Sequence, residues 1–334
     1  MKNTRIPIVF AADNYYVPYM AVMIQSIMEN ADQNRQYIFF ILHQGISNDN
    51  MDLLNKQIAH FHPFSIEFIN VSSYIGKYNL FVSRHVTVET YFRLLIPELL
   101  TEYQKAIYLD GDMICRTDIG ELFDINIENY LLASVRDTAV ALYYSKKEEE
   151  YLKNIHSVLS SLKKPDEYFN GGMCIFNIEL FRKTISTEKL LELAASREWQ
   201  LHDQDVLNYV AEGKTLLLPY RWNFMTMMPH SEYLPEHLQN EYQEAQNNPK
   251  IIHYAVKPWS CYNYIINFEL FWKYATRTPF IDTIIERMKT KNFVSNNSLR
   301  DIIISNIKNR NGIGIRFILF DCVKAWLSRK KKLS

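Results

Sequence analysis

Two aspartates separated by one glycine are the residues whose types and spacing are best suited to chemistry. Asp110-Gly111-Asp112 follows directly on an apolar segment, residues 106–109. Carboxylates two apart at the end of a buried strand can face one point in space, because Gly111 allows a tight backbone turn between them. Two negative charges so close together repel, and a divalent cation with oxygen ligands relieves that repulsion. The motif therefore predicts a metal site, with an ordinary turn after a strand as the alternative.

Two further polar motifs lie in the second half of the chain. His202 is followed by Asp203-Gln204-Asp205 at the start of an expected helix, where the helix dipole favours acids in the first turn. The same residues could instead form a polar cluster that faces a carbohydrate. Asn170-Gly171-Gly172 predicts a turn with positive φ, and a turn that contains glycine also lets the backbone approach a ligand closely.

A histidine and a lysine lie close together further along the chain. His253 ends the short apolar run Ile251-Ile252-His253, and Lys257 follows four residues later. A lone histidine in such a place is usually a satisfied core residue. It becomes a metal ligand only if Asp110 and Asp112 lie across from it. Lys257 is a point charge that suits a phosphate, with a surface loop anchored by a tryptophan as the alternative.

The elements that must position these residues are visible as alternating apolar and amphipathic segments. Expected strands cover residues 5–12, 37–42, 65–70 and 106–109, and expected helices cover residues 17–29, 47–61 and 87–100. Such alternation predicts an α/β fold with a mostly parallel sheet flanked by helices. Ligands bind beyond the carboxyl ends of the strands in such sheets, and Asp13 and Asp110 both lie there. Later strands are expected at 131–136, which ends at Asp137, and at 215–218.

Composition restricts the class of protein. The 334 residues are 48% hydrophobic and carry a net charge of +0, which leaves an acidic body, because residues 308–334 hold eight Lys/Arg against one Asp. We therefore expect no nucleic-acid partner. The four cysteines form no Cys-x-x-Cys pair, which argues against a zinc site and favours small core residues in a reducing compartment. No signal peptide and no apolar window of membrane-spanning length is expected, so we expect a cytoplasmic protein.

The order of the motifs carries more information than any one of them. Across residues 5–260 the chain resembles glycosyltransferase family 8, the retaining bacterial galactosyl- and glucosyltransferases that extend lipopolysaccharide and related surface glycans. The resemblance rests on six motifs in sequence: Ala11-Ala12-Asp13, Arg93, Asp110-Gly111-Asp112, Phe169-Asn170-Gly171-Gly172, Asp203-Gln204-Asp205, and His253 followed by Lys257-Pro258-Trp259.

This resemblance implies a GT-A type, Rossmann-like glycosyltransferase domain over residues 1–265, followed by a C-terminal helical region, residues 266–334. It implies that Asp110, Asp112 and His253 hold manganese, or alternatively magnesium. It also implies a set of donor-site residues, namely Ala11, Asp13, Tyr15, Arg93, Asp110, Gly111, Asn170, Gly171 and Lys257. Asp203 and Gln204 are the implied catalytic residues, and Asp137 lies toward the acceptor.

The implied reaction is retaining transfer of galactose or glucose from a UDP-sugar to a glycan or glycolipid acceptor of the lipopolysaccharide type. Gln204 stands where a double displacement would need a nucleophile, and an amide is a poor one. We therefore expect a front-face substitution. Tyr15 departs from the family's usual Asn, and the segment between His253 and Lys257 is shorter than usual and lacks the family's glycine. A sugar-nucleotide hydrolase and a non-catalytic nucleotide-sugar-binding protein are the alternative functions.

The C-terminal tail predicts a separate property. Residues 313–327 place polar side chains on one arc of a helix and apolar and aromatic ones on the rest, and Arg329-Lys330-Lys331-Lys332 follows. Such a basic amphipathic helix is typical of segments that lie on an anionic membrane surface. The prediction is a protein peripheral to the inner face of the cell membrane. A helix docked on the body, with a solvated basic end, is the alternative.

Overall fold

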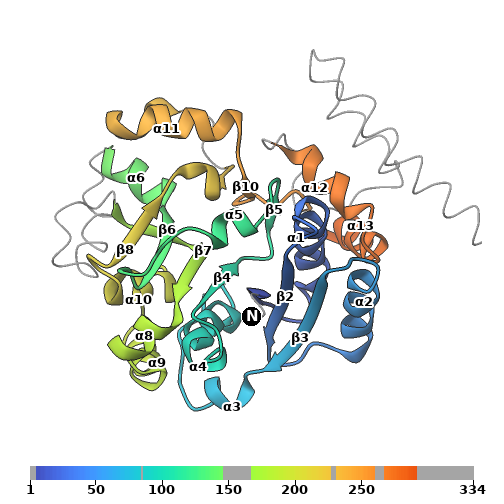
Figure 1. The fold of residues 1–334 in the computed structure, drawn as a ribbon, viewed down its shortest axis with the longest axis horizontal. Helices are drawn as coiled ribbons and strands as arrows, with labels where there is room; N and C mark the ends of the chain where they lie inside the picture. The colour runs from blue at the N-terminus through green and yellow to red at the C-terminus, as the bar shows by residue number, and fades with distance from the viewer. Residues whose placement is uncertain (1–4, 84–85, 146–166, 227–230, 260–266, 292–334) are drawn as a thin grey trace, which may run out of the picture.

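A seven-stranded mixed sheet forms the centre of the fold in this computed structural model, which describes residues 5–83, 86–145, 167–226, 231–259 and 267–291 (Figure 1). The strand order is β3-β2-β1-β4-β7-β6-β8. The strands are β1 (Arg5–Ala11), β2 (Gln36–His43), β3 (Phe64–Asn70), β4 (Lys105–Leu109), β6 (Leu132–Arg136), β7 (Phe169–Asn177) and β8 (Thr215–Leu218). Every paired contact is parallel except those of β7, which runs antiparallel to β4 and β6. The expected mostly parallel α/β sheet is confirmed.

Helix α1 (Val17–Asn30) is buried over residues 17–28 without interruption. A helix buried all round needs partners on more than one side. One side packs on the sheet, and another meets α12 (Phe268–Ala275) and α13 (Ile281–Lys291), whose apolar side chains share a core cluster with Tyr19 and Val22 (Figure 1). The C-terminal helices therefore pack directly against the helix that follows the first strand. The division into domains at residue 265 stays a prediction.

The segment expected to be helical over 87–100 is helical, but it consists of two pieces of different type. It forms a 3₁₀ helix, η1 (Val88–Leu95), followed by the short α4 (Ile96–Leu99). Pro97 has no N–H to donate to the carbonyl of Arg93 four residues earlier, so a regular α-helix cannot continue through this point. The tighter segment nevertheless carries Arg93 inward, where it is buried.

The turn expected at Asn170-Gly171-Gly172 is also wrong, because all of Phe169–Asn177 is strand β7. Among the described glycines, positive φ occurs at Gly213 and not at these positions. The register against β6 jumps from Ser134–Cys174 to Val135–Asn170, so residues 171–173 bulge out of that ladder. A bulge bends a strand locally and re-aims its residues. Here it brings the two glycines beside the carboxyl end of β4.

A second, three-stranded sheet completes the region beyond β4. It consists of β5 (Met113–Cys115), β10 (Ile251–His253) and β9 (Phe224–Met225), in the order β5-β10-β9. The antiparallel pairing of β10 with β5 sets His253 opposite Met113, the residue after Asp112. Two short segments far apart in the chain thereby bring a histidine to the aspartate motif.

The remaining elements cover the sheet and connect its strands. They are α2 (Asn48–Ile58), α3 (Ser72–Ile75), α5 (Gly120–Phe123), α6 (Thr138–Ser145), α8 (Ile178–Thr184), α9 (Thr187–Ala195), α10 (Asp203–Val210), η3 (Tyr220–Trp222), η4 (Ser231–Tyr233) and α11 (Glu236–Asn247). The amphipathic tail at 313–332 lies outside the described residues. Within the part of the chain that is described, no helix is both long enough and apolar enough to cross a membrane.

Candidate active site

Asp110, Asp112 and His253 converge at the junction of the two sheets. Asp110 follows β4, Asp112 precedes β5 and His253 ends β10 (Figure 1). Each offers one ligand atom, and these atoms all lie within 4.8 Å of one another. His253 Nε2 is 3.4 Å from Asp112 Oδ1, and both side chains are buried. Two residues of the aspartate motif and the distant histidine thus form one cluster.

Two observations show that this cluster fits a divalent cation. Asp112 Oδ1 is buried and has no hydrogen-bond partner among the described residues, so it is an acceptor without a donor. A Cβ on Gly172 would lie 2.6 Å from His253 Cε1 and 2.9 Å from Asp110 Oδ2, so a side chain there would enter the cluster. Two carboxylates and one imidazole are a ligand set that suits Mn²⁺.

Lys257 and Tyr16 complete the surroundings of Asp112. Lys257 Nζ forms an ion pair with Asp112 Oδ2 and donates to the Tyr254 carbonyl at 2.9 Å. Burial alone would raise the pKa of Asp112, but the ammonium group of Lys257 holds that pKa well below its usual range. Burial, followed by the charges of Asp112 and Asp110, raises the pKa of Tyr16. Asp112 is therefore an ionised carboxylate beside a neutral phenol.

Asp110, Asp112 and His253 are called the cation cluster. Arg93 connects this cluster to Asp203 and to the β7 bulge. Its Nε lies 2.8 Å from Asp203 Oδ2, its Nη2 lies 3.1 Å from Asp110 Oδ1, and its Nη1 donates to the Gly171 carbonyl. Burial would lower the pKa of Arg93, but Asp110 and Asp203 raise it above its usual value. One buried cation therefore holds a carboxylate of the metal cluster, a carboxylate of α10 and the backbone of the β7 bulge.

Asp203 is 2% exposed and also accepts a hydrogen bond from Thr90. Burial raises the pKa of Asp203 to about 6, although Arg93 and the Thr90 hydroxyl favour its carboxylate form. Its carboxylate faces Arg93 and Thr90. Asp203 is thereby joined through Arg93 to Asp110 and to the β7 bulge.

The side-chain amides of Gln204 and Asn170 and the carboxylate of Asp137 form a hydrogen-bonded network beside the β7 bulge. Gln204 Oε1 accepts from Gly171 N at 2.8 Å and from Asn170 Nδ2 at 3.2 Å. Asp137 Oδ2 accepts from Asn170 Nδ2 at 3.0 Å and from Gln204 Nε2 at 3.1 Å. The predicted catalytic, donor and acceptor residues from three different elements thus meet in one hydrogen-bonded group.

The remaining predicted residues lie at the end of β1, in the loop before α1 and, in the case of Gly111, against the start of α1. Ala11 ends β1, and Asp13 Oδ1 accepts from Tyr16 N at 2.6 Å. Tyr15 is 43% exposed, and a Cβ on Gly111 would lie 3.0 Å from Met20 Cβ, so Gly111 packs against the start of α1. This loop therefore adjoins the cluster through Tyr16.

Three residues outside the motifs of the sequence analysis contact the site. Tyr108 donates to Asp110 Oδ1 at 2.9 Å, Tyr16 lies beside Gly111, and Asn223 Oδ1 is 3.0 Å from His253 Nδ1. Gly172, which belongs to a selected motif but was given no role in the site, lies against the cluster of Asp110, Asp112 and His253. Tyr108 stands next to the aspartate motif, so neighbourhood could have found it. Asn223 has no such local signal, because β9 reaches the site only through its pairing with β10.

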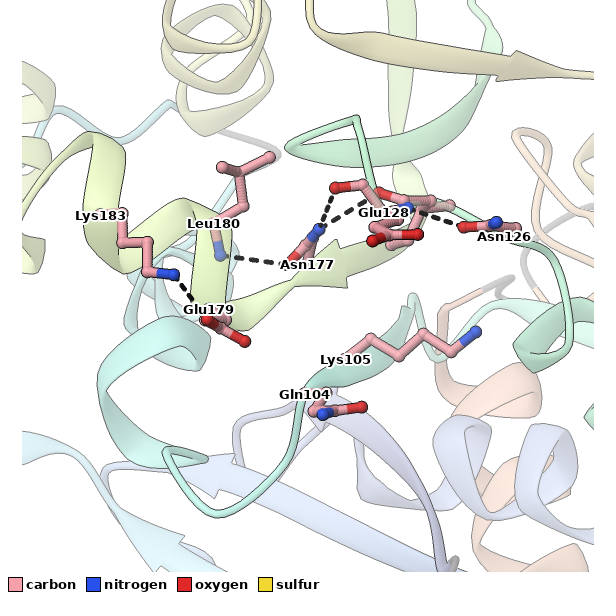
Figure 2. A pocket seen from close by; sticks show the side chains of 9 residues that line it. Gln104, Lys105, Asn126, Glu128, Asn177, Glu179, Leu180 and Lys183 are labelled. Carbon is pink, nitrogen blue, oxygen red and sulfur yellow. Dashed lines mark hydrogen bonds and ion pairs between the residues drawn. The ribbon is translucent and has the colours of Figure 1, made fainter.

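A separate cavity of about 480 Å³ lies at the start of β4 and the end of β7, opposite to the strand ends that meet the cation cluster (Figure 2). Figure 2 shows Asn177 and Lys183 engaged with neighbouring groups. Asn177 Nδ2 donates to the Ile127 carbonyl at 3.1 Å, and Lys183 pairs with Glu179 at 2.5 Å. None of the predicted site residues lines it. Ligands of such sheets bind at the carboxyl ends of parallel strands, so this cavity is distinct from the candidate site.

Several known proteins are similar to this chain in amino-acid sequence. General stress protein A of Bacillus subtilis (strain 168) is 30% identical over 269 residues, which cover 78% of this chain and 89% of that protein. A putative glycosyltransferase of Haemophilus influenzae is 30% identical over 219 residues, or 65% of this chain and 62% of that protein. A lipopolysaccharide 1,2-glucosyltransferase of Escherichia coli K12 is 26% identical over 258 residues, or 75% and 72%. The chain thus spans less than two thirds of the Haemophilus relative.

Solved structures agree with the fold. The bifunctional glycosyltransferase WbbM is 26% identical with a TM-score of 0.75, over 85% of this chain and 51% of that chain. The galactosyltransferase LgtC, solved with donor and acceptor sugar analogs, is 24% identical with a TM-score of 0.65, over 82% and 96%. The latter likeness supports the GT-A fold alone.

A family model described as glycosyl transferase family 8 matches residues 7–262, a segment that contains every residue of the cluster and of the amide network. That match covers most of the chain, and the Bacillus relative is similar over nearly its whole length. The protein with this junction of carboxylates, histidine and amides belongs to glycosyltransferase family 8.

Proposed function

We propose that this protein transfers galactose or glucose from a UDP-sugar to a cell-surface glycan acceptor, such as lipopolysaccharide or lipooligosaccharide, with retention at the anomeric carbon and with the help of Mn²⁺ or Mg²⁺. The observation that carries the proposal is the position of two adjacent glycines. A Cβ on Gly172 would meet the cation cluster, and a Cβ on Gly171 would meet Arg93 and Gln204. We propose that the diphosphate of the donor binds beside Gly172 and its sugar beside Gly171, where no side chain obstructs either group. The names of the Escherichia coli relative and of LgtC point to the same class of reaction.

The diphosphate end of the donor needs positive charge, because a nucleoside diphosphate is a poor leaving group without it. Asp110, Asp112 and His253 would hold a divalent cation, which would supply charge neutralisation there. Lys257 is held beside Asp112 by its ion pair, so its ammonium group is already in place for a phosphate. We propose that the donor phosphate competes with Asp112 for this lysine.

The sugar end is organised before any ligand arrives. Arg93 holds the Gly171 carbonyl while Gln204 accepts from the Gly171 N–H, so the peptide groups before and after the Gly171 Cα are both fixed. Preorganised polar groups avoid reorganisation during the reaction. Asp137 Oδ1 accepts from Ala139 N at 2.9 Å and from Val140 N at 3.1 Å, while its Oδ2 holds the two amides. We propose that Asp137 orients these amides on the acceptor side rather than acting as a base.

The side chain of Gln204 distinguishes two mechanisms that retain the configuration of the anomeric carbon, double displacement and front-face substitution. A double displacement needs a nucleophile at the anomeric carbon, and an amide is a poor one. We propose a front-face substitution. The bond from the anomeric carbon to the phosphate oxygen breaks, the bond to the acceptor oxygen forms on the same face, and the acceptor hydroxyl proton passes to the departing phosphate oxygen.

A donor screen tests the proposal. The full chain is incubated with UDP-galactose or UDP-glucose and Mn²⁺ or Mg²⁺, with and without a lipooligosaccharide acceptor, and released UDP and the anomeric configuration of the product are measured. Transfer requires acceptor-dependent UDP release and a retained configuration. Equal UDP release without acceptor indicates a sugar-nucleotide hydrolase. Binding of UDP-sugar without release indicates a non-catalytic binding protein. Asp110→Asn and Asp112→Asn should each abolish metal-dependent release.

We also propose that residues 313–332 attach the protein to the inner face of the cell membrane. The support is the sequence alone, with aromatic residues on one part of a helix and four consecutive cations after it. Each cation near an anionic surface contributes roughly 1 kcal/mol. The full chain should bind phosphatidylserine vesicles at low salt and leave them as salt rises. Indifference to these vesicles at low salt would contradict attachment.

A further inference from the structure

We infer that Asn223 is a positioning residue that keeps the neutral side chain of His253 in the one tautomer able to bind a metal ion. The inference deepens the metal-assisted transfer proposed above and rests on it. Asn223 follows η3, directly precedes β9 and is 1% exposed, and its partners His253 and Asn170 are also buried. None of the sequence motifs includes it. Its role follows from the direction of five hydrogen bonds.

The first of these bonds begins at a main-chain group. The N–H of Gly172 can only donate, and it donates to Asn170 Oδ1 at 3.0 Å. This identifies which end of the Asn170 amide is oxygen. The other end, Nδ2, then lies 3.0 Å from Asp137 Oδ2 and 3.2 Å from Gln204 Oε1, and both of these atoms are acceptors. The orientation of Asn170 is therefore consistent on both sides.

The orientation of the Asn170 amide determines the orientation of the Asn223 amide, which in turn determines the tautomer of His253. Asn223 Nδ2 donates to Asn170 Oδ1 at 2.9 Å, so the oxygen of the Asn223 amide is the atom 3.0 Å from His253 Nδ1. A carbonyl oxygen can only accept, so His253 Nδ1 carries the hydrogen. A neutral imidazole has one N–H, which leaves the lone pair on Nε2.

Nε2 is the nitrogen that faces the carboxylates. It lies 3.4 Å from Asp112 Oδ1, the buried oxygen with no hydrogen-bond partner among the described residues. A lone pair on Nε2 and a free carboxylate oxygen are both ready to bind a cation. In the other tautomer an N–H would occupy this space and would have to leave first. Outer partners that fix a histidine ligand in this way typically contribute 10- to 100-fold to metal affinity.

The source of this control is the fold itself. A main-chain N–H keeps its proton and cannot rotate relative to its peptide, and the β7 bulge sets its direction. The hydrogen bonds run from Gly172 and Asn170 of β7 through Asn223, which lies just before β9, to His253 of β10. The tautomer is therefore set before the cation arrives.

Long-range ¹H–¹⁵N NMR of the metal-free full chain, with ¹⁵N-labelled histidine, reads the tautomer directly. At alkaline pH, the neutral side chain of wild-type His253 should carry its proton on Nδ1. Asn223→Ala removes the acceptor, so the proton should move to Nε2, facing Asp112. Asn223→Asp still offers an oxygen to Nδ1 but loses its donation to Asn170, so it should retain the Nδ1–H form. Packing loss alone cannot separate these two variants in that way.

Asn208→Ala is the matched control. Asn208 is also buried and holds the Phe169 N–H, the Phe169 carbonyl and the Gln204 carbonyl, each at 2.9 Å. Its truncation removes a similar number of hydrogen bonds outside the chain that ends at His253. The His253 tautomer should not change in this variant. An Nε2–H signal in the wild type, or an unchanged Nδ1–H signal in Asn223→Ala, would overturn the inference.

Binding of Mn²⁺ alone, measured by the electron paramagnetic resonance of the free ion, supplies the second readout. Asn223→Ala should weaken binding by about tenfold or more, while Asn223→Asp and Asn208→Ala should stay within a few-fold of the wild type. Equal affinity in Asn223→Ala and wild type would overturn the role of the tautomer in metal binding. A wild type that binds no Mn²⁺ would instead remove the proposed metal function, and the NMR result would still decide what Asn223 does.

Discussion

The carboxamide oxygen of Gln204 accepts a hydrogen bond of 2.8 Å from the main-chain N–H of Gly171. This bond fixes which end of the side chain is oxygen, and it turns the Gln204 amino group toward Asp137 Oδ2 at 3.1 Å. The Gln204 amide thus accepts from Gly171 and Asn170 and donates to Asp137. A glutamate could satisfy the two donors but not the acceptor.

Gln204→Glu should therefore lower turnover on the order of 10²-fold, because two carboxylates about 3 Å apart repel and displace one another. Protonation of one carboxyl restores a donor, so the ratio of variant to wild-type turnover should rise as the pH falls. UDP affinity, measured by calorimetry, should change little, since UDP lacks the sugar. A turnover ratio that does not depend on pH would contradict this explanation.

Gly172→Ala should weaken Mn²⁺ binding by roughly 10- to 100-fold. The added Cβ would lie 2.6 Å from His253 Cε1 and 2.9 Å from Asp110 Oδ2, so these two ligands must separate. Overpacking of this kind also costs about 1–3 kcal/mol of the free energy of unfolding. Gly45→Ala is the control, because a Cβ there has nothing within 4 Å. Equal Mn²⁺ affinity in the two variants would show that Gly172 does not border the cluster.

Asp203 should make the free energy of unfolding depend on pH. Burial raises its folded-state pKa to about 6, above its ordinary value of 3.8, so the folded protein binds this proton more tightly than the unfolded chain does. The stabilisation is fully present below the unfolded pKa and is lost as the pH rises through about 6, with a slope of up to about 1.4 kcal/mol per pH unit. Asp203→Asn removes this titration.

Urea unfolding of wild type and Asp203→Asn at about pH 4.5 and about pH 7.5 measures the effect. The stability advantage of the wild type over the variant should shrink as the pH rises. A constant offset would reflect only the lost ion pair with Arg93. An advantage that grows with pH would mean that the folded state lowers the pKa of Asp203 rather than raising it.

Arg287 should support nucleotide binding from beyond the segment matched by the family model. Its guanidinium lies 4.1 Å from the centre of the Tyr15 ring, and its Nη1 donates to the Tyr15 carbonyl. A contact of this kind contributes about 0.5–1 kcal/mol at an exposed site. Arg287→Ala should therefore weaken UDP affinity a few-fold and leave kcat almost unchanged.

Arg277→Ala is the matched control for this prediction. Arg277 also reaches α1 from the C-terminal region, but it pairs with Glu29 at 2.7 Å, near the opposite end of that helix. Its truncation should not alter UDP affinity. Equal effects of the two variants would indicate a general loss of packing between α1 and the C-terminal helices.

The sequence predicts local relationships well. The apolar runs that became β1, β2 and β4 follow from hydrophobic pattern, because a strand buried on both faces needs continuous apolar residues. The partly exposed β3 follows instead from alternation of apolar and polar residues. The placement of two carboxylates after β4 is equally local, since only one residue separates them. Where neighbours in space mattered, a prediction failed: residues 170–172 are strand rather than turn.

By itself the sequence determined the α/β order and the aspartate motif, and the order of its motifs pointed to the family. Only the tertiary structure decided that His253 meets Asp112, that Arg93 pairs with Asp203, and that Asn223 orients the histidine. The physical reason is the shortness of the segments involved. β5, β10 and β9 have three, three and two residues, too few for any periodic signal. Their pairing is selected by hydrogen bonds and burial that exist only when distant parts of the chain have come together.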